Sequence, residues 1–154
     1  MTPNDFIAAI GPSAQVSMVV SKIPASFTIA QSALESRWGT SQLFRQAMNI
    51  FGVKADPSWS GPTVSMHTVE YIHGQAETVP ALWRRYSSWQ ECMDDHAAFL
   101  HQNERYAAAF LCTDGQSFAQ AIAAAGYATD PRYGDKLCTI IDVHNLENLD
   151  RSPT

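Results

Sequence analysis

The stretch ASFTIAQSALESRWG, from Ala25 to Gly39, predicts a helix of about four turns. Thr28, Gln31 and Glu35 lie one above another on one face of this helix. A neighbouring face carries apolar residues at helical spacing, namely Ala30, Ala33, Leu34 and Trp38. We therefore expect the rest of the chain to pack around this helix, with the polar face left for chemistry.

Glu35 is the only acidic residue of the predicted helix and lies in its last turn. The negative end of a helix dipole disfavours an ionised carboxylate, so the pKa of Glu35 is expected to be raised. A carboxylic acid that stays protonated near neutral pH can act as the general acid in glycosidic-bond cleavage, because the leaving sugar oxygen must receive a proton. A solvated Glu on an exposed helix face fits the same pattern.

Four segments carry a resemblance to a known family: AQSALESRWGTS at 30–41, NIFGVKA at 49–55, Tyr71, and GYATDPRY at 126–133. In this order they resemble the bacterial endo-β-N-acetylglucosaminidase domain (glycoside hydrolase family 73) of flagellar peptidoglycan hydrolases, autolysins and phage lysins. The resemblance covers about residues 15–143. It implies a hydrolase of the β-1,4 glycan strand of peptidoglycan, with Glu35 as general acid.

Composition points to one globular domain. The chain has 154 residues, of which 45% are hydrophobic and 16% charged. We expect a single domain over residues 1–146, a flexible C-terminal tail at 147–154, and a monomer. The net charge of −5 argues against a nucleic acid partner, because a phosphate backbone requires a positive surface.

Neither a membrane span nor a secretory signal is predicted. The longest apolar runs are broken by Ser, Lys and Pro, and the start MTPNDFIAAIGPSAQ lacks a basic segment and a long apolar centre. We therefore expect synthesis in the cytoplasm and action on the cell wall, in the periplasm of a host or target cell, after export or release. Cys92, Cys112 and Cys138 have no CxxC spacing and are expected to be reduced, buried thiols.

The predicted fold is mainly α, a lysozyme-like helical domain with a small β-hairpin lobe. Thr2-Pro3 predicts a helix start, Gly11-Pro12 its end, and Ser13 the start of a second helix that Pro24 closes. Residues 63–83 alternate and are rich in β-branched side chains, which predicts a hairpin around His73-Gly74. Further helices are expected at 88–100, 105–112 and 117–125, with a last one from Asp130-Pro131.

A glycosidase commonly needs a second carboxylate, and the sequence offers two candidates. Glu70 lies near the end of the first hairpin strand, where the resembled family often has an acid that faces the cleft. Asp56 follows the NIFGVKA motif and matches a position proposed for the second acid in flagellar members. We favour Glu70, because a strand fixes its direction better than the loop before Pro57 does; an exposed structural role remains open for both acids.

Tyr127 belongs to the segment that the family places beside the catalytic Glu. By that resemblance its hydroxyl would hold the substrate's N-acetyl group or the developing charge, if the acetamide acts as internal nucleophile. Asp130, directly before Pro131, fits a helix cap. Phe51, Trp59, Tyr71 and Tyr133 are candidate sugar-stacking platforms and Asn49 a candidate hydrogen-bonding group, although core packing explains aromatic residues equally well.

No metal site or cofactor is predicted. The histidines lack an HExxH pattern, and His96 and His101, five residues apart, share no helix face well. The sequence therefore favours a glycosidase without a metal or cofactor. Its alternatives are a muramidase or lytic transglycosylase on the same fold, or an inactive wall-binding module. The biological role is either a phage endolysin or a secreted antibacterial effector, and an effector would need an inhibitor protein to protect its producer.

Overall fold

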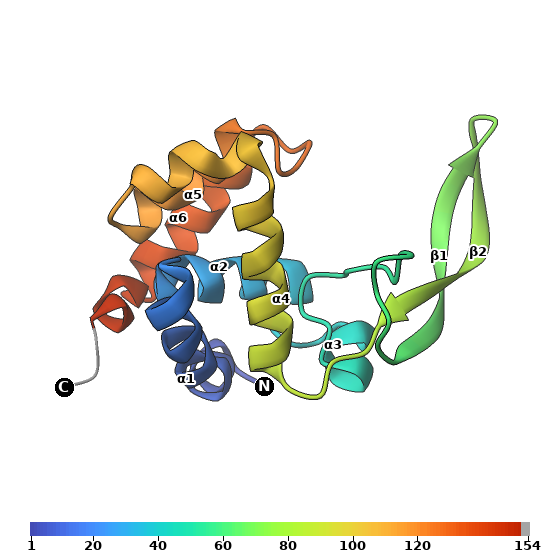
Figure 1. Cartoon of the computed structure of the whole chain (residues 1–154), viewed down its shortest axis with the longest axis horizontal. Coiled ribbons are helices and arrows are strands. Elements are labelled where there is room, and N and C mark those ends of the chain that lie inside the picture. The colour runs from blue at the N-terminus through green and yellow to red at the C-terminus, as the bar shows by residue number, and fades with distance from the viewer. Residues whose placement is uncertain (152–154) are drawn as a thin grey trace.

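Helices form most of the protein, and a two-stranded hairpin projects from them (Figure 1). The computed structural model describes residues 1–151. The helices are α1 (Pro3–Ser21), α2 (Ala25–Ser36), α3 (Gln42–Ala47), α4 (Trp89–Gln102), the 3-10 helix η1 (Glu104–Leu111), α5 (Gly115–Ala124), α6 (Tyr133–Val143) and the 3-10 helix η2 (Leu146–Asp150). The strands are β1 (Thr63–Ile72) and β2 (Gln75–Arg84). The prediction of a mainly α domain with a hairpin lobe is confirmed.

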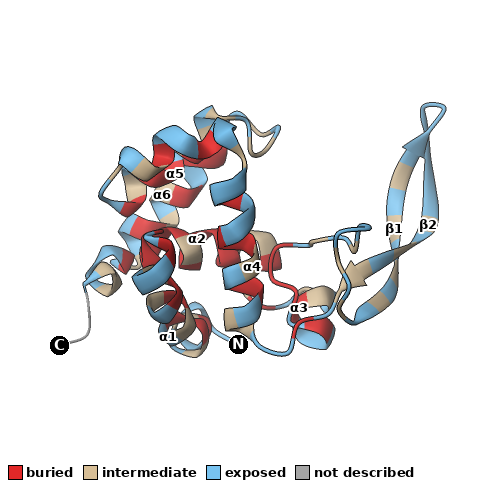
Figure 2. Cartoon of the chain, viewed as in Figure 1, coloured by how far each residue is buried: buried red, intermediate tan, exposed pale blue. Residues whose placement is uncertain are grey.

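Helix α2 lies at the centre of the helical part and contacts α1, α5, α6 and η2. Figure 2 shows that buried residues concentrate on α2 and on the faces that surround it. The helix ends at Ser36, because Arg37, Trp38 and Gly39 all adopt positive φ. A Cβ atom at Gly39 would lie 3.0 Å from the ring of Phe6, so only glycine allows this close approach.

The predicted break at Gly11-Pro12 is wrong, since α1 is one helix with Pro12 inside it. Proline removes the hydrogen bond to the carbonyl of Ala8, but both residues lie on the exposed side of α1, where water can replace that bond. On the opposite side Phe6, Ile10 and Ala14 are buried continuously across the proline. Burial of this stripe keeps the two halves in one helix.

The hairpin matches its prediction closely. Strands β1 and β2 pair antiparallel from Thr63 opposite Arg84 to Ile72 opposite Gln75. His73 and Gly74 form the turn with φ of 52° and 78°, as two-residue hairpin turns require. The tip projects away from the helices and is largely exposed (Figures 1 and 2). The base is joined to the rest of the chain by backbone hydrogen bonds from Arg84 to Val53 and from Tyr86 to Ala47, the last residue of α3.

The predicted flexible tail at 147–154 is corrected for its first residues, and 152–154 lie outside the described part of the chain. Residues 147–150 belong to η2, and Asp150 accepts hydrogen bonds from the Ser26 backbone N–H (2.7 Å) and hydroxyl (2.6 Å). Helix α2 begins after Pro24, which provides no side-chain cap. Asp150 therefore supplies from the far end of the chain the acceptor that the first turn of α2 needs.

The three cysteines are unpaired thiols, of which Cys92 is buried and Cys112 and Cys138 are half-buried. The expectation of burial thus holds fully for Cys92 alone. Within residues 1–151 no helix combines the length and apolar character needed to cross a membrane. The same part of the chain holds no cluster of three or more His, Cys, Asp or Glu side chains suited to a metal ion.

Candidate active site

Glu35 lies where two hollows meet. The larger has a volume of about 1090 Å³ and extends along α4, η1 and the loop after Gly126; the smaller has about 230 Å³ and lies toward α3 and the hairpin base. Glu35 and Gly52 line both hollows. The larger one exceeds the roughly 300–1,000 Å³ of small-molecule sites, which suits a polymer that crosses Glu35.

The Glu35 carboxyl is half-buried, and burial raises its pKa above the ordinary value. The sequence predicted this direction, but from the helix dipole, whereas burial is the main cause in the structure. The hydroxyl of Tyr133 donates a hydrogen bond of 2.7 Å to Oε1 of Glu35, which partly offsets the rise in pKa. The geometry leaves Oε2 as the oxygen available to carry a proton.

A series of hydrogen bonds connects the buried His96 to Glu35 through Gln31 and Tyr133. His96 Nε2 lies 2.8 Å from Oε1 of Gln31, and Gln31 Nε2 donates to the Tyr133 hydroxyl at 3.0 Å. An amide oxygen only accepts, so His96 carries its proton on Nε2. Because Tyr133 accepts from Gln31, its own proton is directed to Glu35. Burial lowers the pKa of His96 to about 4, which keeps the ring neutral at pH 7.

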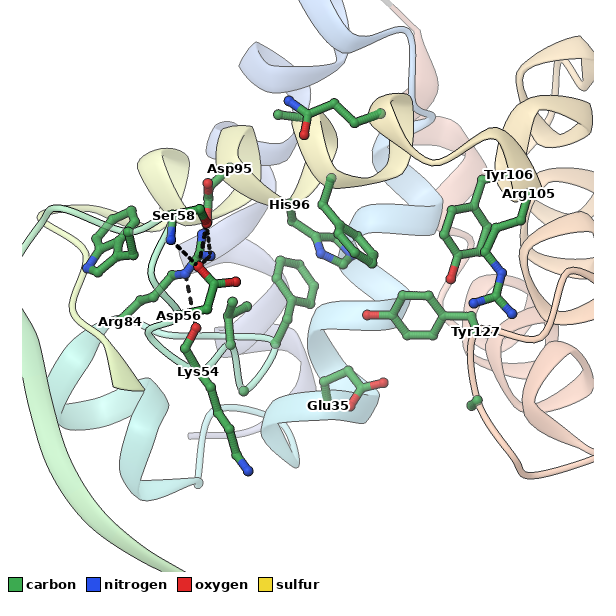
Figure 3. A pocket seen from close by; sticks show the side chains of 18 of the residues that line it. Glu35, Lys54, Asp56, Ser58, Arg84, Asp95, His96, Arg105, Tyr106 and Tyr127 are labelled. Carbon is green, nitrogen blue, oxygen red and sulfur yellow. Dashed lines mark hydrogen bonds and ion pairs between the residues drawn. The ribbon is translucent and has the colours of Figure 1, made fainter. Parts of the chain in front are cut away.

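Tyr127 lies beside this series of hydrogen bonds. Its ring stacks on that of Tyr133, with centroids 5.6 Å apart and planes at 18°, and meets His96 edge-on at 5.9 Å. Burial and the neighbouring charge of Glu35 raise the pKa of Tyr127. The hydroxyl points into the larger hollow (Figure 3). Tyr127 thus remains neutral and presents a hydrogen-bonding group on the side where Glu35 lies.

The four candidate stacking residues divide into two pairs. Phe51 and Trp59 line the larger hollow; Phe51 stacks on His96 at 4.0 Å, and Trp59 carries the Arg84 guanidinium at 5.0 Å from its ring centroid. Tyr133 is buried and serves Glu35, so it offers no free face to a sugar. Tyr71 is 79% exposed on the hairpin and lines neither hollow.

Asn49 does not keep a free group for a substrate. Its side chain is buried, donates to the carbonyls of Val53 and Arg84 at 2.9 Å each, and accepts from the Val53 N–H at 3.0 Å. These bonds close the NIFGV turn and tie it to the hairpin base. Asn49 lines the smaller hollow, but its buried amide is committed to loop geometry, so its expected contact with substrate stays a prediction.

The two candidates for the second carboxylate lie in different surroundings. Glu70, on β1, pairs with Lys54 at 2.8 Å and lines neither hollow. Asp56 lines the larger hollow, where hydrogen bonds from Ser58 hold its pKa below the ordinary value and Arg84 lies 3.3 Å away. The preference for Glu70 thus receives no support from the shape of the cleft in the free protein.

One cluster at the cleft was missed by sequence reasoning. Asp95 of α4 accepts hydrogen bonds from Arg84 (2.8 Å) and the Tyr86 hydroxyl (2.6 Å), and Arg84 also reaches Asp56. This cluster fixes the hairpin base to α4 at one end of the larger hollow (Figure 3). No local sequence signal joins these residues, because the bonds depend on how the hairpin returns to the helices.

A mainly helical domain with a half-buried glutamic acid at the floor of a long cleft is the arrangement of the lysozyme-like glycoside hydrolases. The chain belongs to the family described as mannosyl-glycoprotein endo-beta-N-acetylglucosaminidase, whose model matches residues 11–146. This confirms the resemblance stated for the sequence and the lysozyme-like assignment of the fold.

Individual relatives support the family assignment. Over 142 residues the chain is 42% identical to the peptidoglycan hydrolase FlgJ of Salmonella typhimurium, covering 90% of this chain and 45% of that protein. It is 36% identical to the exo-glucosaminidase LytG of Bacillus subtilis, covering 94% and 52%. It therefore spans about half the length of these relatives. The solved glycoside hydrolase domain of Salmonella typhimurium FlgJ matches with a TM-score of 0.82 at 40% identity, covering 94% of this chain and 98% of that one.

Proposed function

We propose that the chain hydrolyses the β-1,4 glycan strand of bacterial peptidoglycan on the reducing side of N-acetylglucosamine, with Glu35 as general acid. The observation that carries the proposal is a half-buried carboxyl of raised pKa at the junction of two hollows. A strand that runs through both hollows would pass its scissile bond over Glu35. The similarity to FlgJ, a peptidoglycan hydrolase, supports the substrate, and the similarity to LytG, an exo-glucosaminidase, supports the bond.

In this proposal Glu35 gives its proton from Oε2 to the leaving sugar oxygen. As the carboxylate forms, the Tyr133 hydroxyl donates to Oε1 and stabilises the new charge, since hydrogen bonds to ionised groups are stronger than neutral ones. Gln31 and His96 keep that hydroxyl turned toward Glu35. The negative charge on Glu35 therefore develops beside a hydrogen-bond donor that is already oriented.

We propose that the acetamide oxygen of the substrate attacks the anomeric carbon as the bond to the leaving oxygen breaks, and that water then opens the cyclic intermediate, with Tyr127 holding the acetamide. Tyr127 supports this because its neutral hydroxyl faces the cleft on the Glu35 side. Glu70 is held by Lys54 outside both hollows in the free protein. Hinge motion through Pro57, Gly61 and Pro62 would be needed to bring the hairpin carboxylate toward the bond.

The proposed setting is lysis of a cell wall, reached in the periplasm of a host or target cell. The protein would act as a phage endolysin or as a secreted antibacterial effector, and an effector would be accompanied by an inhibitor protein in its producer. The genes that neighbour its own would distinguish these two roles.

Digestion of purified walls followed by mass spectrometry of the fragments tests the proposal. Fragments with reducing N-acetylglucosamine ends support it. Reducing N-acetylmuramic acid ends would instead identify a muramidase, and anhydro ends a lytic transglycosylase. Walls that remain intact but retain the protein would show a binding module and overturn the proposed activity.

A further inference from the structure

Each cationic side chain that lines the larger hollow pairs with a carboxylate of residues 1–151, except that of Arg105. Lys54 pairs with Glu70 at 2.8 Å. Arg84 pairs with Asp95 at 2.8 Å and with Asp56 at 3.3 Å. Arg105 also lines this hollow, yet within residues 1–151 it forms no ion pair. Its positive charge is therefore not matched by a carboxylate of residues 1–151.

The Arg105 guanidinium is held in place, although it is exposed. Its Nε–H donates to the carbonyl of Ala125 at 3.1 Å, and its Cζ lies 5.5 Å from the centroid of the Tyr106 ring. One terminal nitrogen lies 3.0 Å from the point where a Cβ atom at Gly126 would stand, so any larger residue there would press on it. These contacts fix the group while its terminal N–H groups make no hydrogen bond within the described residues.

The position of Arg105 gives the cleft two unlike ends. In Figure 3 Arg105 lies beside Tyr106 and Tyr127, and the Arg84, Asp56 and Asp95 cluster lies at the opposite side, with His96 between them. One end thus holds an arginine paired with two carboxylates, and the other presents a cation that forms no ion pair within residues 1–151. In a protein of net charge −5, such a cation is a local attraction for an anion and not part of a general positive surface.

We propose that Arg105 binds a carboxylate of the peptide stems carried by the glycan strand, and so favours strands that bear peptides. The inference rests on the proposed peptidoglycan substrate. In a strand that bears stems the sugar units offer neutral hydroxyl and acetamide groups, because the lactyl carboxyl of each muramic acid is amide-linked to its stem, whereas the stems supply carboxylates. A guanidinium presents parallel N–H donors that match both oxygens of a carboxylate. Arg105 is in this account a specificity-determining residue, separate from the proton transfer at Glu35.

Binding measured without turnover tests this proposal. The Glu35→Gln protein, with and without Arg105→Gln, is sedimented with purified walls from which phosphate-containing polymers have been removed. One batch of walls is untreated, and in the other the stem carboxylates are converted to neutral amides with a carbodiimide and an amine. Arg45→Gln, a change of an exposed arginine on α3 that lines neither hollow, is the matched control.

We expect Arg105→Gln to weaken binding to untreated walls about tenfold, the effect of one charge-assisted contact, and to change binding to amidated walls little. Arg45→Gln should leave both unchanged. Equal binding by both proteins to untreated walls, or an equal loss on both kinds of wall, would overturn the proposal. The wild-type protein, with Glu35 intact, shows in the digestion described above whether the chain hydrolyses walls at all. Failure of the proposed hydrolysis can therefore be distinguished from failure of the proposed role of Arg105.

Discussion

The hydroxyl of Tyr133 lies 2.7 Å from Oε1 of Glu35, and this bond joins two segments that are 98 residues apart in the chain. Burial raises the pKa of Glu35, and the bond from Tyr133 acts against that rise. Proton affinity at Glu35 is thus set by two opposed effects that come from different parts of the sequence. Substitutions in the hydrogen bonds that connect His96, Gln31 and Tyr133 to Glu35 should separate the effect of burial from that of the Tyr133 bond.

Tyr133→Phe removes the bond to Glu35 and keeps the ring. A bond that stabilises the ionised form lowers a pKa, so its loss should raise the pKa of Glu35 further. Because the general acid must be protonated, the alkaline limb of the pH profile of kcat should move to higher pH. The maximal kcat should fall about tenfold, since the forming carboxylate loses its donor. A limb that moves to lower pH would contradict this account.

Gln31→Met should lower stability, because the buried His96 N–H loses its acceptor and the Tyr133 hydroxyl oxygen loses its donor. An unsatisfied buried polar group costs about 1–3 kcal/mol, so we expect a loss of about 2 kcal/mol in the free energy of unfolding. Urea denaturation measures this loss. Gln46→Met, at an exposed position of α3, should change stability by no more than about 0.5 kcal/mol. Equal stabilities of the two variants would refute the stabilising role of the hydrogen bonds that Gln31 forms with His96 and Tyr133.

Tyr127→Phe should lower the rate of wall hydrolysis at least as much as Glu70→Gln does. The first change removes a hydroxyl that faces the cleft, and the second neutralises a carboxylate that lines neither hollow. Initial rates of both variants on the same walls provide the comparison. If Glu70→Gln abolished activity while Tyr127→Phe had little effect, the hairpin carboxylate would return to the centre of the mechanism.

Asp150→Ala should destabilise the fold by about 2 kcal/mol, because the Ser26 N–H and hydroxyl both lose a charged acceptor. Thermal or urea unfolding measures the effect. Asp142→Ala, at an exposed position of α6, is the control and should have an effect within about 0.5 kcal/mol. Wild-type stability of Asp150→Ala would restore the flexible tail that the sequence suggested.

Local patterns predicted α2, the hairpin and the position of Glu35, because helical spacing, strand alternation and the turn residues act over short distances. The same local reasoning failed at Pro12, where a buried stripe on the far side of α1 holds the helix together. It could not distinguish a sugar-binding Asn49 from one that closes its own loop, since that depends on the burial of the amide.

The features that could not be predicted depend on contacts between residues that are far apart in the sequence. Asp150 caps α2 across 124 residues, and His96 reaches Gln31 across 65. From the sequence, His96 is considered only as a possible metal ligand. Its role as a neutral, buried hydrogen-bond partner of Gln31 could not be predicted. The resemblance to a known family supplied Tyr127 and Tyr133, but the distinct roles of the two rings follow from which of them is buried.

The central claim is that Glu35 gives its proton to the leaving sugar oxygen, and Glu35→Gln tests it with shape preserved. Burial raises the pKa of Glu35, so its ionisation lowers the stability of the folded state as the pH rises above the unfolded pKa. Glu35→Gln should therefore melt at a higher temperature than wild type at pH 7, and this difference should disappear well below the unfolded pKa. A higher melting temperature at pH 7 would show that any loss of activity does not come from unfolding.

The decisive measurement is the initial rate of turbidity loss of purified walls, with wild type, Glu35→Gln and Asp142→Asn compared at equal concentration. The account predicts a rate for Glu35→Gln that is lower by at least about a hundredfold, because the proposed proton donor is gone, and an unchanged rate for Asp142→Asn. A Glu35→Gln rate close to that of wild type would contradict the assignment of Glu35 as the general acid.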